Sequence, residues 1–102
     1  MDALAHRLGT WDVAAFCEGH GIQRLAVFGS VLRDDFGPES DIDVLVRLDR
    51  RRKPDLYDLV QIRDDLQALW GRPVDVIEED GLRNPYRRRH IEQTRRILYD
   101  AG

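Results

Sequence analysis

The chain has 102 residues, of which 42% are hydrophobic and 34% charged, with four prolines and eight glycines. This length supports one modest core, so we expect a single domain over residues 1–102. The composition excludes disordered and collagen-like proteins. No apolar stretch approaches the ~20 residues that span a bilayer, and the first nine residues lack a signal-peptide core. These features predict a cytoplasmic protein with no membrane partner.

The predicted elements begin with a helix and an apolar strand. Residues 10–18 are expected to form the helix, with Thr10 as its N-cap. Residues 25–28 form a buried strand. A loop over 34–40 then leads to the clearest strand of the sequence, 41–48.

The second half of the chain continues this alternation. Asp55 is the predicted N-cap of an amphipathic helix that ends at Gly71. Residues 73–77 follow as a strand and 85–94 as a basic helix, while 97–99 fit either a helical extension or a short strand. Alternating strands and helices predict an α/β (α+β) fold, a small mixed sheet covered on one face by helices.

The charge of the chain is unevenly distributed. The net charge is -3, but residues 34–49 carry six acids and one arginine, whereas 83–96 carry six arginines and one acid. This segregation indicates two different electrostatic roles on one small surface. The single cysteine, Cys17, cannot form an internal disulfide and is interpreted as a buried small hydrophobe.

Two aspartates open the strand at 41–48. Strand alternation places Asp41 and Asp43 on the same face. Two carboxylates about 4 Å apart repel by roughly 4 kcal/mol at an effective dielectric near 20, and a hard divalent cation such as Mg²⁺ removes that repulsion. On the solvent face of an edge strand, an isolated Asp-x-Asp is also tolerated without a metal.

The preceding strand adds a second feature to this end of the sheet. It ends in Gly29 and Ser30, where the glycine lets the backbone approach a ligand closely. The amides of Ser30 and Val31, at the start of a short helical turn, would receive a phosphate. A phosphate site and a metal site are therefore predicted to face each other.

A third carboxylate is expected from the strand at 73–77. If Val74 and Val76 pack on the helices, Asp75 emerges on the open face beside Asp43. Three carboxylates from two strands can hold two metal ions. The acids that follow are competitors for this role, interpreted as solvated loop charges: Glu78, Glu79 and Asp80.

The string Gly29-Ser30, ten residues and then Asp41-Ile42-Asp43 resembles the GS-x10-D-x-D signature of the DNA polymerase β-like nucleotidyltransferases. The chain is most similar to the minimal nucleotidyltransferases, or MNT proteins, nearly end to end. The resemblance implies the polymerase β-like fold. It also implies that Gly29 and Ser30 bind the triphosphate of ATP and that Asp41 and Asp43 bind Mg²⁺. Asp75 would bind metal too, in a two-metal site, and help to deprotonate the acceptor.

Two positions of the intervening loop bear on the nucleotide. Arg33 matches a frequent arginine of the family's loop, which implies a contact with phosphate, although a surface charge is an equal alternative. Asp34 stands where the family often has glycine, which leaves the path of the loop open.

MNT proteins act chiefly as antitoxins encoded beside HEPN ribonuclease toxins. The resemblance implies that this chain transfers AMP from ATP to a tyrosine of a cognate HEPN toxin and so neutralises it. An antitoxin that neutralises by binding alone is the first alternative, and an aminoglycoside-type enzyme is another. An arginine-rich nucleic-acid-binding module is a third, but net acidity, a single lysine and the lack of a recognised binding motif argue against direct nucleic-acid binding.

Overall fold

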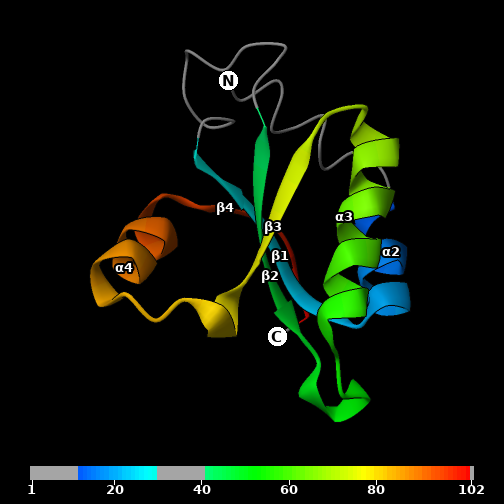
Figure 1. The fold of residues 1–102 in the computed structure, drawn as a ribbon, viewed down its shortest axis with the longest axis horizontal. Helices are drawn as coiled ribbons and strands as arrows, with labels where there is room; N and C mark the ends of the chain where they lie inside the picture. The colour runs from blue at the N-terminus through cyan, green and yellow to red at the C-terminus, as the bar shows by residue number, and fades with distance from the viewer. Residues whose placement is uncertain (1–11, 30–40, 102) are drawn as a thin grey trace.

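The computed structural model describes residues 12–29 and 41–101. In this part of the chain, three α-helices flank a four-stranded sheet (Figure 1). None of these helices is long and apolar enough to cross a membrane. The elements are α2 (Val13–His20), β1 (Ile22–Phe28), β2 (Ile42–Leu48), η2 (Arg50–Arg52), α3 (Leu56–Trp70), β3 (Val74–Glu78), η3 (Glu79–Gly81), α4 (Pro85–Thr94) and β4 (Arg96–Asp100).

The sheet is mixed, as predicted, with strand order β3-β2-β1-β4. β1 lies antiparallel to both β2 and β4, whereas β2 and β3 are parallel because α3 carries the chain back between them. Residues 97–99, which the sequence left undecided, belong to the edge strand β4.

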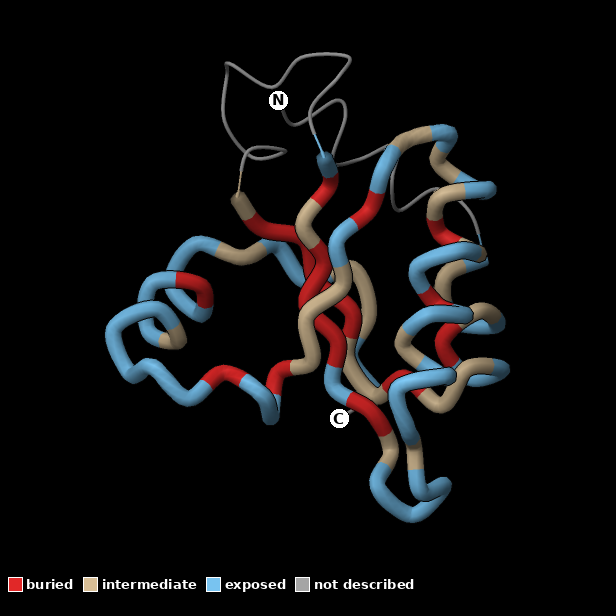
Figure 2. Tube along the Cα trace, in the orientation of Figure 1, coloured by how far each residue is buried: buried red, intermediate tan, exposed pale blue. Residues whose placement is uncertain are grey.

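The main core lies between the sheet and α2 and α3. Alternate residues of β1 and β2, including Leu25 and Val44, are fully buried against Ile62 and Leu66 of α3. Figure 2 shows the buried stretch running along β1 and β2 in the middle of the sheet. The expected cover on one face is confirmed.

The opposite face of the sheet also receives a helix. Ile91 of α4, together with Leu82, packs over Phe28 and Leu45 in a second, smaller cluster. We call this surface the α4 face. Its cover is partial. The side chains of Asp43 and Arg47, at alternate positions along β2, also point to this face.

The predicted ends of α3 and α4 are confirmed. Asp55 caps α3 in a reciprocal capping box with Asp58, and Gly71 ends the helix with a left-handed φ of 67°. The side chain of Asn84 accepts hydrogen bonds from two backbone amides at the start of α4. These contacts satisfy amides that have no partner within the helix.

The start of α2 differs from the prediction. Asp12 is the N-cap, since its carboxylate accepts a hydrogen bond from the amide of Ala15 at 3.1 Å. Thr10, the predicted cap, lies outside the described residues. Aspartate and threonine side chains both accept such bonds, and Asp12 lies two residues after Thr10 in the sequence.

Cys17 of α2 is fully buried in the main core, which confirms its interpretation as a small hydrophobe. Burial, and secondarily the nearby Glu18 carboxylate, raises the pKa of this thiol to about 12. The side chain is therefore protonated at neutral pH and unsuited to nucleophilic chemistry.

Candidate active site

Three strands bring their ends together at one edge of the sheet. β1 ends at Phe28 beside the start of β2, because Phe28 pairs with Asp43. β3 begins at the same edge, because Asp43 is also the register partner of Asp75. We call this edge, with Gly29, Asp41, Asp43 and Asp75, the carboxylate edge.

Gly29 lies directly against one of these carboxylates. Its φ is 75°, a conformation that side-chain-bearing residues rarely adopt. A Cβ at this position would lie 2.4 Å from Oδ2 of Asp43. Glycine is therefore required here to leave room for the aspartate, a reason that the sequence pattern did not provide.

Asp43 and Asp75 lie side by side on parallel strands, as predicted. Adjacent strands are about 4.8 Å apart, and register partners point to the same face. Asp43 is partly buried, whereas Asp75 is exposed. Asp41, also exposed, comes one residue before β2. Two carboxylates in register repel each other unless a cation or a proton lies between them.

The donor chemistry of this pair fits a hard divalent cation. Carboxylate oxygens are the ligands that Mg²⁺ prefers, and one or two of them suffice when phosphates and water complete the shell. Within residues 12–29 and 41–101, no three His, Cys, Asp or Glu side chains form a group that could hold a metal ion. The strand register places Asp43 and Asp75 together. The ligand set of three carboxylates, which adds Asp41, stays a prediction.

The predicted nucleotide loop cannot be compared with the structure beyond its first residue. Ser30, Arg33 and Asp34 lie outside the described residues. Their expected contacts with the triphosphate stay predictions, and Gly29 is the member of this set that the structure places.

The prediction that three acids at the end of β3 are solvated loop charges holds for the exposed Asp80, but it is wrong for Glu78, the last residue of β3, and for Glu79. Glu79 is only 6% exposed, and its Oε1 accepts a hydrogen bond from Arg24 at 3.0 Å. Glu78 and Asp80 both pair with Arg50. The 3-10 turn η3 turns this segment back along the sheet, and nothing in the local pattern indicates partners so distant in sequence.

These acids also do not compete with Asp75 for the carboxylate edge. Glu78 is the register partner of Val46, three residues further along both strands than the Asp43–Asp75 pair. About 10 Å of strand therefore separates them from that pair. Their contacts with arginines give them a structural role at the other end of the sheet.

The comparisons with known proteins agree with this geometry. A family model described as "Nucleotidyltransferase domain" matches residues 13–98. A solved structure of a candidate minimal nucleotidyltransferase is 32% identical, with a TM-score of 0.73 over 93% of this chain and 92% of that chain. The protein adenylyltransferase MntA of Thermococcus cleftensis is 33% identical over 67 residues, 66% of each protein.

A more distant likeness concerns the fold alone. A chain in a solved structure of the tri-AMPylated Shewanella oneidensis HEPN toxin in complex with MNT antitoxin has a TM-score of 0.65. That match is 15% identical and covers 92% of this chain and 71% of the other.

Proposed function

The chain belongs to the nucleotidyltransferase domain family, and from that premise we propose that it is a Mg²⁺-dependent protein adenylyltransferase that acts as an antitoxin. Its reaction transfers AMP from ATP to a tyrosine hydroxyl of a partner HEPN ribonuclease toxin. The observation that carries the proposal is the pairing of Asp43 with Asp75 beside Gly29. The protein adenylyltransferase name of a relative and the AMPylated toxin of a structural neighbour support it.

The carboxylate edge has groups suited to each part of this reaction. Asp43 and Asp75, joined by Asp41, would hold Mg²⁺, which when bound neutralises charge on the phosphates. Asp75 would also accept the proton of the tyrosine hydroxyl as its oxygen attacks the α-phosphorus. The new bond joins that oxygen to phosphorus, the bond to the β-phosphate oxygen breaks, and pyrophosphate leaves.

The position of the edge suits an acceptor that belongs to another protein. Asp41 and Asp75 are both exposed, so a protruding side chain can reach them. Their negative charge favours a basic partner, and a ribonuclease that binds RNA presents a basic surface. Association with the toxin should therefore weaken as salt is raised.

The decisive experiment combines the protein, Mg²⁺, ATP labelled at the α-phosphate and the HEPN protein encoded beside it. We expect label on the toxin with the native chain and at least ~10³-fold less with Asp43→Asn. Asp64→Asn, on the exposed surface of α3, is the matched control and should transfer normally. Mutating the acceptor tyrosine to phenylalanine should remove the label, and EDTA should stop the reaction.

A second candidate, neutralisation by binding alone, is favoured by one observation. The described residues contain no group of three metal-binding side chains. If Asp43→Asn binds and neutralises the toxin as well as the native chain while no label is transferred by either, sequestration replaces catalysis. If Asp43→Asn loses both label transfer and neutralisation while the native chain retains both, the result supports adenylyl transfer.

A further inference from the structure

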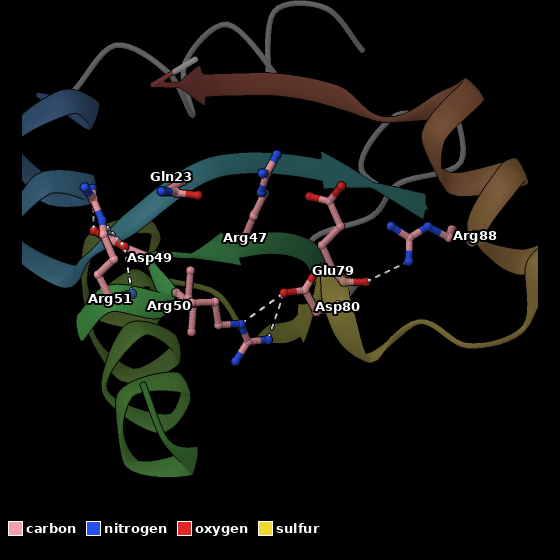
Figure 3. Close-up of a pocket in the computed structure, with 9 residues that line it drawn as sticks. Gln23, Arg47, Asp49, Arg50, Arg51, Glu79, Asp80 and Arg88 are labelled. Atoms are coloured by element: carbon pink, nitrogen blue, oxygen red, sulfur yellow. Dashed lines mark hydrogen bonds and ion pairs between the residues drawn. The ribbon is translucent and has the colours of Figure 1, made fainter. Parts of the chain in front are cut away.

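A groove of about 580 Å³ opens on the α4 face, at the end of β2 opposite to the carboxylate edge (Figure 3). Arg47, which lines it, lies four residues beyond Asp43, or about 13 Å along the strand. Between them Leu45 is 1% exposed and packs with Leu82 and Ile91. This apolar cluster separates the groove from the candidate active site.

The acids of the groove are already neutralised by arginines. Each lies within 3.1 Å of a guanidinium nitrogen. Hydrogen bonds from Arg51 also lower the pKa of Asp49, which keeps that carboxylate ionised. The pairs are Asp49 with Arg51, Asp80 with Arg50, and Glu79 with Arg24.

Arg47 is different from these arginines. Within the described residues its guanidinium makes no hydrogen bond or ion pair, and Figure 3 shows it rising from β2 on the same side as Glu79. Its register partner across the sheet is Arg24, another cation on the same face. Like charges directly opposite each other destabilise a strand pair. Glu79 and Asp100 compensate Arg24, so Arg47 is the groove's excess positive charge.

The wall of the groove also contains an unsatisfied acceptor. Oε2 of Glu79 is buried and has no hydrogen-bond partner within the described part of the chain. A buried carboxylate oxygen normally accepts at least one hydrogen bond. The groove therefore combines a cation that lacks an anion with an acceptor that lacks a donor.

We propose that this groove binds a small phosphomonoester. Arg47 holds the phosphate, because the planar guanidinium matches phosphate oxygens with two parallel hydrogen bonds. Hydroxyl groups of the ligand donate to the carboxylates of Asp49 and Asp80 at the rim. The volume suits one small molecule.

The test measures binding of ribose 5-phosphate to the full chain by calorimetry, with inorganic phosphate and ribose as separate probes. We expect ribose 5-phosphate to bind, and Arg47→Gln to weaken it by at least ~10-fold. Arg87→Gln is the matched control: it removes an exposed arginine of α4 outside the groove and should change affinity less than ~2-fold. Inorganic phosphate should bind more weakly than the ester, and ribose not at all.

Several results would overturn the proposal. The first is that ribose 5-phosphate does not bind the native chain, and the second is that it binds Arg47→Gln as tightly as the native chain. The third is that Asp43→Asn weakens its binding as much as Arg47→Gln does, which would place the ligand at the carboxylate edge. Binding of single-stranded RNA or polyglutamate that depends on Arg47, without binding of ribose 5-phosphate, would identify a macromolecular partner instead. Melting curves verify that each variant is folded, and AMP transfer by Arg47→Gln should be unchanged without the ester.

Discussion

The two ends of the α4 face use charge in opposite ways. At the carboxylate edge, Asp43 and Asp75 lie in register with like charges side by side. At the groove end, each acid has an arginine partner, and Arg47 is the excess cation. Paired charges at the groove end hold η2 and η3 in place, whereas the excess charge of Arg47 has no structural benefit and indicates a ligand. The arrangement of charges is therefore a better guide to function in this small sheet than their number.

After Asp43→Asn, the largest expected loss of AMP transfer comes from Gly29→Ala at the carboxylate edge. The added Cβ would lie 2.4 Å from Oδ2 of Asp43, so the carboxylate must move. A displacement of that order should lower AMP transfer about 100-fold. The backbone strain at a φ of 75° should also lower the free energy of unfolding by roughly 1 kcal/mol.

Gly71→Ala is the matched control for this substitution. Its φ of 67° produces the same kind of strain, but a Cβ there would meet nothing within 4 Å. We expect a similar loss of stability in urea unfolding and normal transfer. Equal loss of transfer in both variants would show that Gly29 acts through stability and not by leaving room for Asp43.

The next prediction tests whether the buried charge of Glu79 at the groove end stabilises the fold. Glu79→Gln removes a buried charge that faces Arg24 at 3.0 Å and Arg95 at 3.5 Å. Arg95 then loses this anion and Arg24 keeps only Asp100, at 3.3 Å, which should lower the free energy of unfolding by roughly 2–3 kcal/mol and Tm by roughly 10 °C or more. Thermal unfolding followed by circular dichroism measures this change.

Asp80→Asn provides the comparison within the same turn. Its carboxylate is exposed and pairs with the exposed Arg50, so stability should change little. If the two substitutions had the same effect, burial of Glu79 would not determine its role. AMP transfer by folded Glu79→Gln should remain, because this carboxylate lies away from Asp43.

Sequence patterns predicted the carboxylate edge better than the groove end. Alternation along two strands and their parallel pairing suffice to place Asp75 beside Asp43, and local chemistry identified Asp55 and Gly71 as helix ends. The partners of Glu79 could not be predicted in this way, since Arg24 is 55 residues away and the contact depends on the turn after β3. For the same reason, the excess charge of Arg47 became visible only when the partners of every neighbouring arginine were known.

The smallest expected effect is found in a comparison of Arg24 with Arg47, the two arginines that face each other across β1 and β2. Arg24→Gln leaves Glu79 with Arg95 alone, at 3.5 Å, and should lower the free energy of unfolding by roughly 2 kcal/mol. Arg47→Gln instead removes a like-charge neighbour and should raise it by roughly 0.3 kcal/mol in low salt. Urea unfolding of both variants measures the two changes in the free energy of unfolding, which should have opposite signs. Because near-molar salt shortens the Debye length to about 3 Å, the gain for Arg47→Gln should vanish there while the loss for Arg24→Gln persists. A loss of stability in Arg47→Gln would mean that its guanidinium contributes to folding, and its lack of a partner would no longer indicate a ligand.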